Sequence, residues 1–107
     1  MAQADVGIIG GTGLGEALLQ RGGEAVSVET PFGPPSAPPV LAEWNGVRVA
    51  FLARHGNGHV HNPSTVPYRA NIWALKRLGV RSIIASGATG SLRETIAPAD
   101  LALCDQV

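Results

Sequence analysis

The sequence predicts an open α/β fold, with a mixed, twisted sheet flanked by helices. Two apolar runs rich in β-branched residues, at residues 5–9 and 80–86, each lead directly into a glycine-containing turn. A segment of helical periodicity precedes the second run, and an Asn-Gly pair divides another strand-like stretch in two. Strands that alternate with helices are typical of sheets covered by helices, and ligands of such folds bind at the carboxyl ends of the strands.

The first part of the chain is expected to hold a buried strand, a short helix and a long loop. Residues 5–9 form an apolar run of strand length, which indicates a fully buried strand. Residues 14–21 favour a helix closed by the glycine pair that follows, and the alternation over 25–29 indicates a further strand. Residues 30–39 contain five prolines, which exclude a helix and a hydrogen-bonded ladder, so an ordered irregular loop is expected.

A β-hairpin is predicted after this loop. Asn45-Gly46 separates the strand-like residues 40–44 from residues 47–53. Asn-Gly is the strongest short hairpin signal, because both central residues of the turn need positive φ. Two antiparallel strands are therefore expected here.

A helix is predicted from about residue 68 onward. Ser64-Thr65 forms a capping neighbourhood, and Pro67 suits an early helical position. Gly79 is expected to close the helix. The face expected to be buried comprises Tyr68, Ile72 and Leu75, with Ala74 and Leu78 beside it.

Two further strands are expected in the last third of the chain. Residues 80–86 indicate a second buried strand, and residues 101–107 indicate another. Cys104 lies in this last segment and is expected as a small buried hydrophobic residue. Since the chain has one cysteine, an intrachain disulfide is excluded and a reducing compartment is indicated.

Composition narrows the class of protein. The chain has 107 residues, with eight Lys+Arg and eight Asp+Glu, so its formal net charge is zero. That length allows one domain, and without a basic stripe nucleic acid is excluded as a partner. No secretory leader pattern begins the chain and no apolar run reaches about 18 residues, so we expect no membrane partner and a cytoplasmic location.

The turn Gly10-Gly11-Thr12-Gly13 follows the first strand directly and indicates an anion site. Glycine permits positive φ and close approach of a ligand, and a strand-to-helix turn presents free backbone N–H groups. A dinucleotide fingerprint is excluded because Glu16 stands where its third glycine belongs. A nucleotide P-loop is excluded because no Gly-Lys-Ser/Thr follows. A plain tight turn remains the alternative.

A second candidate site begins at Arg54 and His55, directly after the hairpin. A guanidinium matches phosphate oxygens in pairs and stays charged when partly buried, and a histidine can donate to the anion. The alternatives are a structural ion pair for Arg54 and ordinary hydrogen bonding for His55, His59 and His61. Zinc is disfavoured because the loop has no paired cysteine and no nearby carboxylate. Arg69 lies close in sequence, which indicates that this local charge belongs to a site.

Three strand ends therefore carry unusual residues. They are residues 10–13, residues 54–56 and residues 87–91. In an open α/β sheet these ends are expected to converge on one edge. Their convergence favours a phosphate site over a plain turn.

Five segments also occur in a distinctive order and spacing. They are VGIIGGTGL at 6–14, TPFG at 30–33, ARHG at 53–56, YRANIWALK at 68–76 and GSLR at 90–93. In this combination the chain resembles the 5′-methylthioadenosine phosphorylases of the trimeric branch of the purine nucleoside phosphorylase family. The resemblance implies a nucleoside phosphorylase-like fold, truncated, with residues 1–107 as the N-terminal part of a single domain.

The resemblance also implies a reaction. Orthophosphate would attack the anomeric carbon of a purine nucleoside, converting 5′-methylthioadenosine to adenine and 5-methylthioribose 1-phosphate. Thr12 would give a hydroxyl and a backbone donor, Arg54 the charge and His55 a further donor, while the backbone at Gly87 and Ala88 would complete the phosphate site. Orthophosphate is a co-substrate, and no metal or organic cofactor is implied. A homotrimer is implied for the full-length protein.

Some features depart from the pattern of that family. Gly87 stands where members often carry a hydroxyl or amide side chain, and Asn57 stands where arginine is common. The group that protonates the leaving base is expected beyond position 107, so residues 1–107 alone are expected to be inactive. Inosine, guanosine or methylthioinosine remain alternative substrates. A non-catalytic anion-binding fragment is the alternative of another class.

Overall fold

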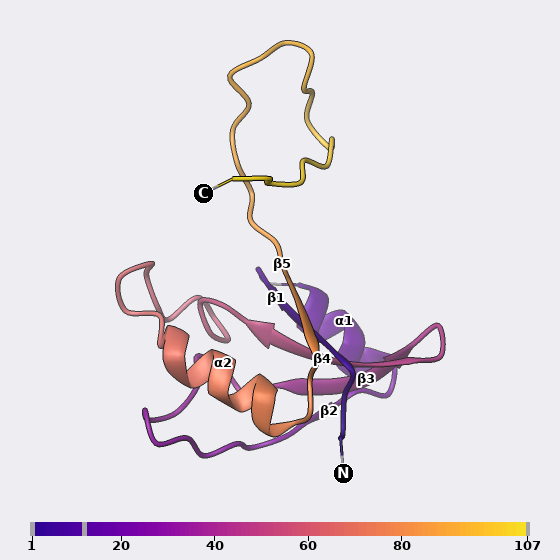
Figure 1. The fold of residues 1–107 in the computed structure, drawn as a ribbon, viewed down its shortest axis with the longest axis vertical. Coiled ribbons are helices and arrows are strands. Elements are labelled where there is room, and N and C mark those ends of the chain that lie inside the picture. Colours follow the sequence, from indigo (N-terminus) through magenta and orange to yellow (C-terminus); the bar gives the residue numbers. More distant parts are fainter. Residues whose placement is uncertain (1, 12, 107) are drawn as a thin grey trace.

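The computed structural model describes residues 2–11 and 13–106. Within these ranges five strands form one sheet in the order β2-β3-β4-β1-β5 (Figure 1). β1 is parallel to β4 and to β5, whereas β3 is antiparallel to β2 and β4, so the sheet is mixed as predicted. The elements are β1 (Val6–Gly10), α1 (Leu14–Gln20), β2 (Glu24–Ala25), β3 (Val40–Trp44), β4 (Val47–Ala53), α2 (Tyr68–Arg77) and β5 (Ser82–Ala85).

The helices cover opposite faces of the sheet (Figure 1). Successive side chains of a strand point to opposite faces, and β4 supplies the core on both sides. Leu52 packs in a buried cluster with Leu75 of α2. Phe51 packs in a second cluster with Leu18 of α1 and Val40 of β3. The central strand β4 is therefore buried from both faces.

The predicted hairpin is confirmed with its residues. β3 and β4 pair antiparallel, and Trp44 lies opposite Val47 across the turn. Asn45 and Gly46 both have positive φ, 50° and 81°. That conformation matches the right-handed twist of the flanking strands, which is why the Asn-Gly signal identifies the turn.

The burial predicted for α2 is wrong in part. Tyr68 and Ile72 are 54% and 49% exposed, whereas Asn71 and Ala74 are buried. Residues three and four apart share a helix face. The buried residues Asn71, Ala74, Leu75 and Leu78 form one such stripe, and Ile72 lies at its edge. The buried residues within the helix are Ala70, Asn71, Ala74 and Leu75.

The capping prediction for Ser64 and Thr65 is also wrong, whereas the one for Gly79 is confirmed. The N–H groups of Ser64 and Thr65 donate to Oδ1 of Asn62 at 2.9 and 3.1 Å, so these residues belong to a separate turn. Pro67 precedes the first helical residue. Gly79, at φ 89°, follows the helix and donates to the carbonyl of Lys76.

Several strand predictions need correction. β2 ends at Ala25 instead of continuing to 29. The N–H of Val26 still donates to the carbonyl of Pro39, but Pro39 and Pro38 have no N–H to donate in return, so the ladder stops there. β1 is only half-buried. β5 is exposed throughout, because it is an edge strand that pairs with β1 alone.

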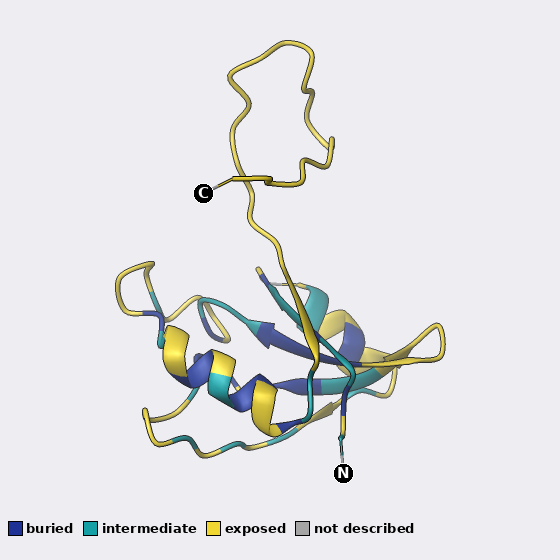
Figure 2. Cartoon of the chain, in the orientation of Figure 1, coloured by how far each residue is buried: buried dark blue, intermediate teal, exposed yellow. Residues whose placement is uncertain are grey.

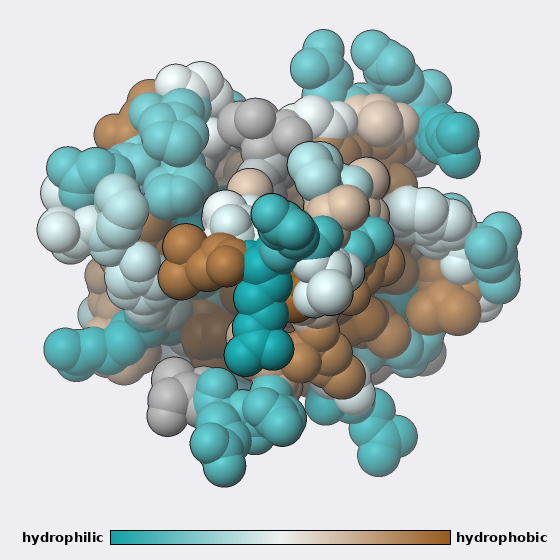
Figure 3. Space-filling view, turned by 90° about the horizontal axis from the view of Figure 1, so that it is seen from above, coloured by the Kyte–Doolittle hydropathy of each residue, from teal (hydrophilic) through white to brown (hydrophobic). Residues whose placement is uncertain are grey.

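The segment after β5 forms an exposed arm that extends away from the sheet (Figures 1 and 2). Residues 101–106 form no strand, because a strand needs a neighbour to accept its hydrogen bonds and no strand lies beside them. Cys104 is exposed, so its predicted burial is wrong. Leu92, Leu101 and Leu103 are fully exposed, and apolar side chains lie among polar ones on the view from above (Figure 3).

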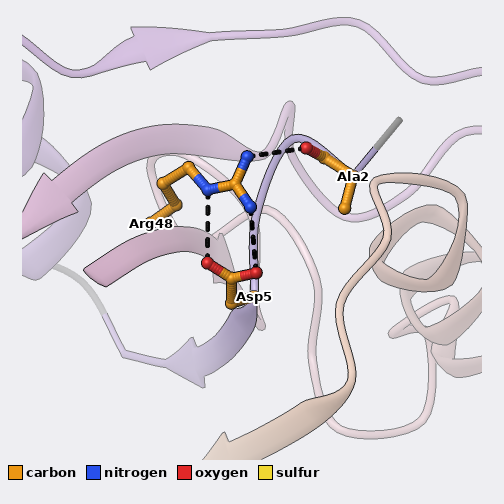
Figure 4. Close-up of polar contacts among 3 residues, drawn as sticks. All are labelled: Ala2, Asp5 and Arg48. Carbon is orange, nitrogen blue, oxygen red and sulfur yellow. Dashed lines mark hydrogen bonds and ion pairs between the residues drawn. The ribbon is translucent and has the colours of Figure 1, made fainter. Parts of the chain in front are cut away.

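An ion pair ties the N-terminal segment to β4 (Figure 4). Nε and Nη2 of Arg48 donate to the two carboxylate oxygens of Asp5 at 3.2 and 3.0 Å. Nη1 donates to the carbonyl of Ala2 at 2.8 Å. Both side chains are about half exposed, so the pair contributes no more than about 1 kcal/mol. Asp5 precedes β1 and thus lies at the end of the sheet opposite the candidate site.

In the part of the chain that the structure describes, neither helix has the length and apolar character that crossing a membrane requires.

Candidate functional site

The three strand ends identified from the sequence converge, as predicted. The N–H of Arg54, just after β4, donates to the carbonyl of Gly10 at 3.0 Å. The N–H of Ser86, just after β5, donates to the carbonyl of Ile9 at 2.9 Å. β1 lies between β4 and β5, and all three run in one direction, so their carboxyl ends share one edge of the sheet. Thr12 lies outside the described residues.

Arg54 joins these strand ends through its guanidinium. Nη2 donates to the carbonyl of Ser86 and, at 3.4 Å, to the carbonyl of Ile9. Nη1 lies 4.0 Å from the position that a Cβ on Gly87 would take. Among the described residues both hydrogen bonds of the guanidinium come from Nη2, and no carboxylate pairs with it. A half-buried cation without a paired carboxylate suits an anionic ligand better than it suits a structural ion pair.

Arg54 and His55 occupy the two central positions of a tight turn. The N–H of Gly56 donates to the carbonyl of Ala53 at 3.1 Å and closes the turn. Gly56 has φ 81°, and a Cβ there would lie 2.8 Å from the carbonyl oxygen of Ser36. Only glycine fits this position, since both the backbone angle and the close approach exclude a side chain.

The imidazole of His55 is oriented by His61. Nδ1 of His55 lies 3.0 Å from the carbonyl oxygen of His61, and the N–H of His61 donates to the carbonyl of His55 at 2.9 Å. A carbonyl can only accept, so Nδ1 carries the hydrogen and Nε2 of the neutral ring carries none. The ring stacks on His59 with centroids 4.5 Å apart. The hydrogen-bonding alternative for His55 thus holds for Nδ1, and Nε2 remains for a ligand.

The other charged and metal-ligating candidates near Arg54 separate into different environments. Arg69 lies over the ring of Phe32, with 5.6 Å from its guanidinium carbon to the ring centroid. This cation–π contact joins Arg69 to the proline-rich loop, and the assignment of Arg69 to the same site as Arg54 stays a prediction. Within residues 2–11 and 13–106 no group of three or more His, Cys, Asp or Glu side chains is placed to hold a metal ion.

The glycines around the first turn serve different purposes. A Cβ on Gly15 would lie 2.8 Å from Cε1 of Phe51, and one on Gly10 would lie 3.3 Å from Cε2. These two glycines make room for the Phe51 ring. A Cβ on Gly11 would meet no atom within 4 Å, and Gly13 has φ 103°. Packing and backbone angle explain three of the four glycines, whereas Gly11 borders open space at the strand ends.

A cleft of about 310 Å³ lies beside this turn, between α1 and the loop after β4. Its lining includes Gly13 and Glu16 at the start of α1, Phe51 of β4, and Asn57 and Gly58 of the loop. Asn57, where the resemblance leads us to expect arginine, is exposed at this cleft. No sequence signal indicates the cleft, because its shape depends on how α1 packs against β4.

The family relationship follows from a comparison of the whole chain with known proteins. Residues 5–107 match the family described as the phosphorylase superfamily. The chain belongs to the phosphorylase superfamily. Its mixed sheet with two helices is part of the fold of that superfamily, as the sequence predicted.

Relatives of this chain within the superfamily include S-methyl-5′-thioadenosine phosphorylases. That of Chloroflexus aurantiacus is 50% identical over 107 residues, which are 100% of this chain and 37% of the relative. That of Thermococcus kodakarensis is 52% identical over 101 residues, which are 94% of this chain and 38% of the relative. The chain thus spans about a third of the length of these relatives and corresponds to their N-terminal portion.

Solved structures of the superfamily agree. A methylthioadenosine phosphorylase from an Antarctic soil metagenomic library superimposes with a TM-score of 0.82 and is 56% identical, covering 94% of this chain and 35% of its own. Methylthioadenosine phosphorylase from Schistosoma mansoni in complex with adenine gives a TM-score of 0.79 at 46% identity, covering 91% of this chain and 35% of its own.

Proposed function

We propose that this chain forms the orthophosphate-binding part of a phosphorylase that converts 5′-methylthioadenosine to adenine and 5-methylthioribose 1-phosphate. The observation that carries the proposal is the placement of Arg54, whose guanidinium spans the ends of β4, β1 and β5. Relatives about half identical to this chain carry the name of that activity. The proposed phosphate ligands are Thr12, Arg54, His55, Gly87 and Ala88.

The chemistry suits a site of this kind. The sugar becomes oxocarbenium-like as the base departs, and the negative charge of the attacking phosphate stabilises it. The protein then mainly holds the phosphate in line with the anomeric carbon, where preorganised donors contribute most. Orthophosphate is the co-substrate of this reaction, which itself requires no organic cofactor.

The group that protonates the purine is assigned to the part of the relatives that this chain does not cover. Asp5 pairs with Arg48 at the far end of the sheet. Asp100 accepts from the N–H of Ala97 in the exposed arm. Residues 1–107 alone are therefore proposed to be inactive, and the complete enzyme is proposed to be a cytoplasmic homotrimer, as in the family that the chain resembles.

The test is a chimera in which residues 1–107 of this chain replace the matching segment of the Chloroflexus aurantiacus relative. The match to that relative covers the whole length of this chain, so the matching segment can be replaced in one piece. We expect adenine to be released from methylthioadenosine only when phosphate is present. A chimera that folds but releases no adenine would contradict the proposal. Profiling with inosine, guanosine and methylthioinosine distinguishes the purine nucleoside alternative.

A non-catalytic anion-binding fragment is tested separately with the 107-residue chain. Dispersed amide NMR signals that shift on phosphate addition would support this alternative. Aggregation, which the exposed edge strand β5 favours, would argue against it.

A further inference from the structure

Ser36 and Asn71 form a buried polar pair. They are 7% and 2% exposed, and they are the buried polar residues within the described part of the chain. The N–H of Ser36, in the proline-rich loop, donates to Oδ1 of Asn71 on α2 at 2.8 Å. Burying an amide is costly unless it is hydrogen-bonded, so this bond fixes the loop to the helix.

The hydroxyl of Ser36 extends this contact to the candidate site. Its Oγ donates to the carbonyl of Ala53 at 2.6 Å. The same carbonyl accepts from the N–H of Gly56, the bond that closes the turn carrying Arg54 and His55. One oxygen is therefore held both from within the turn and from the loop beside it.

The backbone of Ser36 also touches the other end of that turn. Its carbonyl oxygen lies 2.8 Å from where a Cβ on Gly56 would stand. Ser36 thus contacts Ala53, just before Arg54, and Gly56, just after His55. Asn71 in turn holds Ser36 in place.

We propose that Ser36 and Asn71 are positioning residues, which hold the Arg54–His55 turn in the conformation that binds phosphate. The inference rests on the proposed function and adds two residues that touch neither phosphate nor nucleoside. Ser36 acts through the Ala53 carbonyl, and Asn71 acts through the backbone of Ser36. The two bonds are separable, since removal of the hydroxyl leaves the bond between the Ser36 N–H and Asn71 in place.

The experiment measures steady-state kinetics of the chimera carrying Ser36→Ala. Loss of one hydrogen bond should raise KM for phosphate about five- to tenfold. The KM for methylthioadenosine and the thermal midpoint should stay close to the parent values. Ser36→Thr, which keeps the hydroxyl, should recover phosphate affinity. Ser27→Ala is the matched control, because it removes an exposed hydroxyl elsewhere.

The outcomes separate this inference from the proposed function. If the parent chimera shows no phosphate-dependent cleavage, the proposed function fails whatever Ser36 does. If the parent is active, three results for Ser36→Ala would overturn the positioning role alone. The variant matches the parent, it raises the KM for phosphate and the KM for methylthioadenosine equally, or it unfolds. Asn71→Asp, which keeps an acceptor for the Ser36 N–H, should retain more phosphate affinity than Asn71→Ala. Equal losses in these two variants would contradict the role of Asn71.

Discussion

Nη2 of Arg54 donates to the carbonyl of Ser86, so a side chain from the end of β4 reaches the end of β5 across β1. The same nitrogen lies 3.4 Å from the carbonyl of Ile9, on the strand between them. A planar guanidinium offers several donors in fixed directions, so it can use one edge for these carbonyls and keep another for an anion. The position of the charge therefore depends on three strands at once.

The first prediction concerns the charge of Arg54. Arg54→Ala in the chimera should lower kcat/KM for phosphate about 100- to 1000-fold, the usual effect of removing a preorganised donor to a reacting anion. Arg54→Lys should lose less than Arg54→Ala, because it keeps the charge but cannot span the carbonyls of Ile9 and Ser86. Initial rates at varied phosphate concentration give kcat/KM for each variant. Arg48→Ala is the control, and comparable rates in Arg54→Ala and Arg48→Ala would contradict the assignment.

The second prediction concerns Gly87. A Cβ there would meet only Nη1 of Arg54, at 4.0 Å, and no positive φ restricts this residue. Gly87→Thr should therefore be tolerated and should place a hydroxyl beside the guanidinium, lowering KM for phosphate about fivefold through one added hydrogen bond. Gly87→Val adds similar bulk without a hydroxyl, so it separates the effect of the added hydrogen bond from the effect of the added volume. An unchanged KM in Gly87→Thr would show that this position does not face the phosphate.

The third prediction separates packing from ligand binding at the first turn. Gly15→Ala gains about 1 kcal/mol of helix propensity but puts a Cβ 2.8 Å from buried Phe51, and overpacking costs about 1–3 kcal/mol. We expect a lower thermal midpoint. Gly11→Ala meets open space and should leave the midpoint unchanged while raising KM for phosphate. If Gly11→Ala binds phosphate like the parent, the space above Gly11 is not the anion site.

Local chemistry made much of this fold predictable. The hairpin followed from Asn45-Gly46, because positive φ at both residues is a property of the turn itself. The convergence at the site followed from apolar runs that end in glycine or Arg54, because the carboxyl ends of parallel strands meet at one edge. Both predictions succeeded because the structure at these places depends on residues within a few positions of the sequence motif.

Features that depend on distant partners were missed. The exposure of Ile72 depends on which face of α2 meets Leu52 of β4, and periodicity alone allows two neighbouring faces. The Ser36–Asn71 bond joins residues 35 apart. An asparagine within an apolar helix hints at a buried partner, but nothing in the sequence indicates that the partner lies in the proline-rich loop.

The last prediction concerns the two ring nitrogens of His55. Nδ1 donates to the carbonyl of His61, so a contact from His55 to an anion must come from Nε2. The amide of glutamine reaches about as far from the backbone as Nε2, whereas the amide of asparagine reaches only as far as Nδ1. We expect His55→Gln to keep a KM for phosphate closer to the parent value than His55→Asn does. Steady-state kinetics of the chimera at varied phosphate concentration and one fixed pH give the two KM values.

The matched variants identify the histidine responsible. His59→Asn should leave the KM for phosphate close to the parent value, because His59 only stacks on the His55 ring among the contacts described. If the KM for phosphate rises with His59→Asn and stays unchanged with His55→Asn, His59 is the phosphate ligand and the assigned role of Nε2 of His55 is wrong.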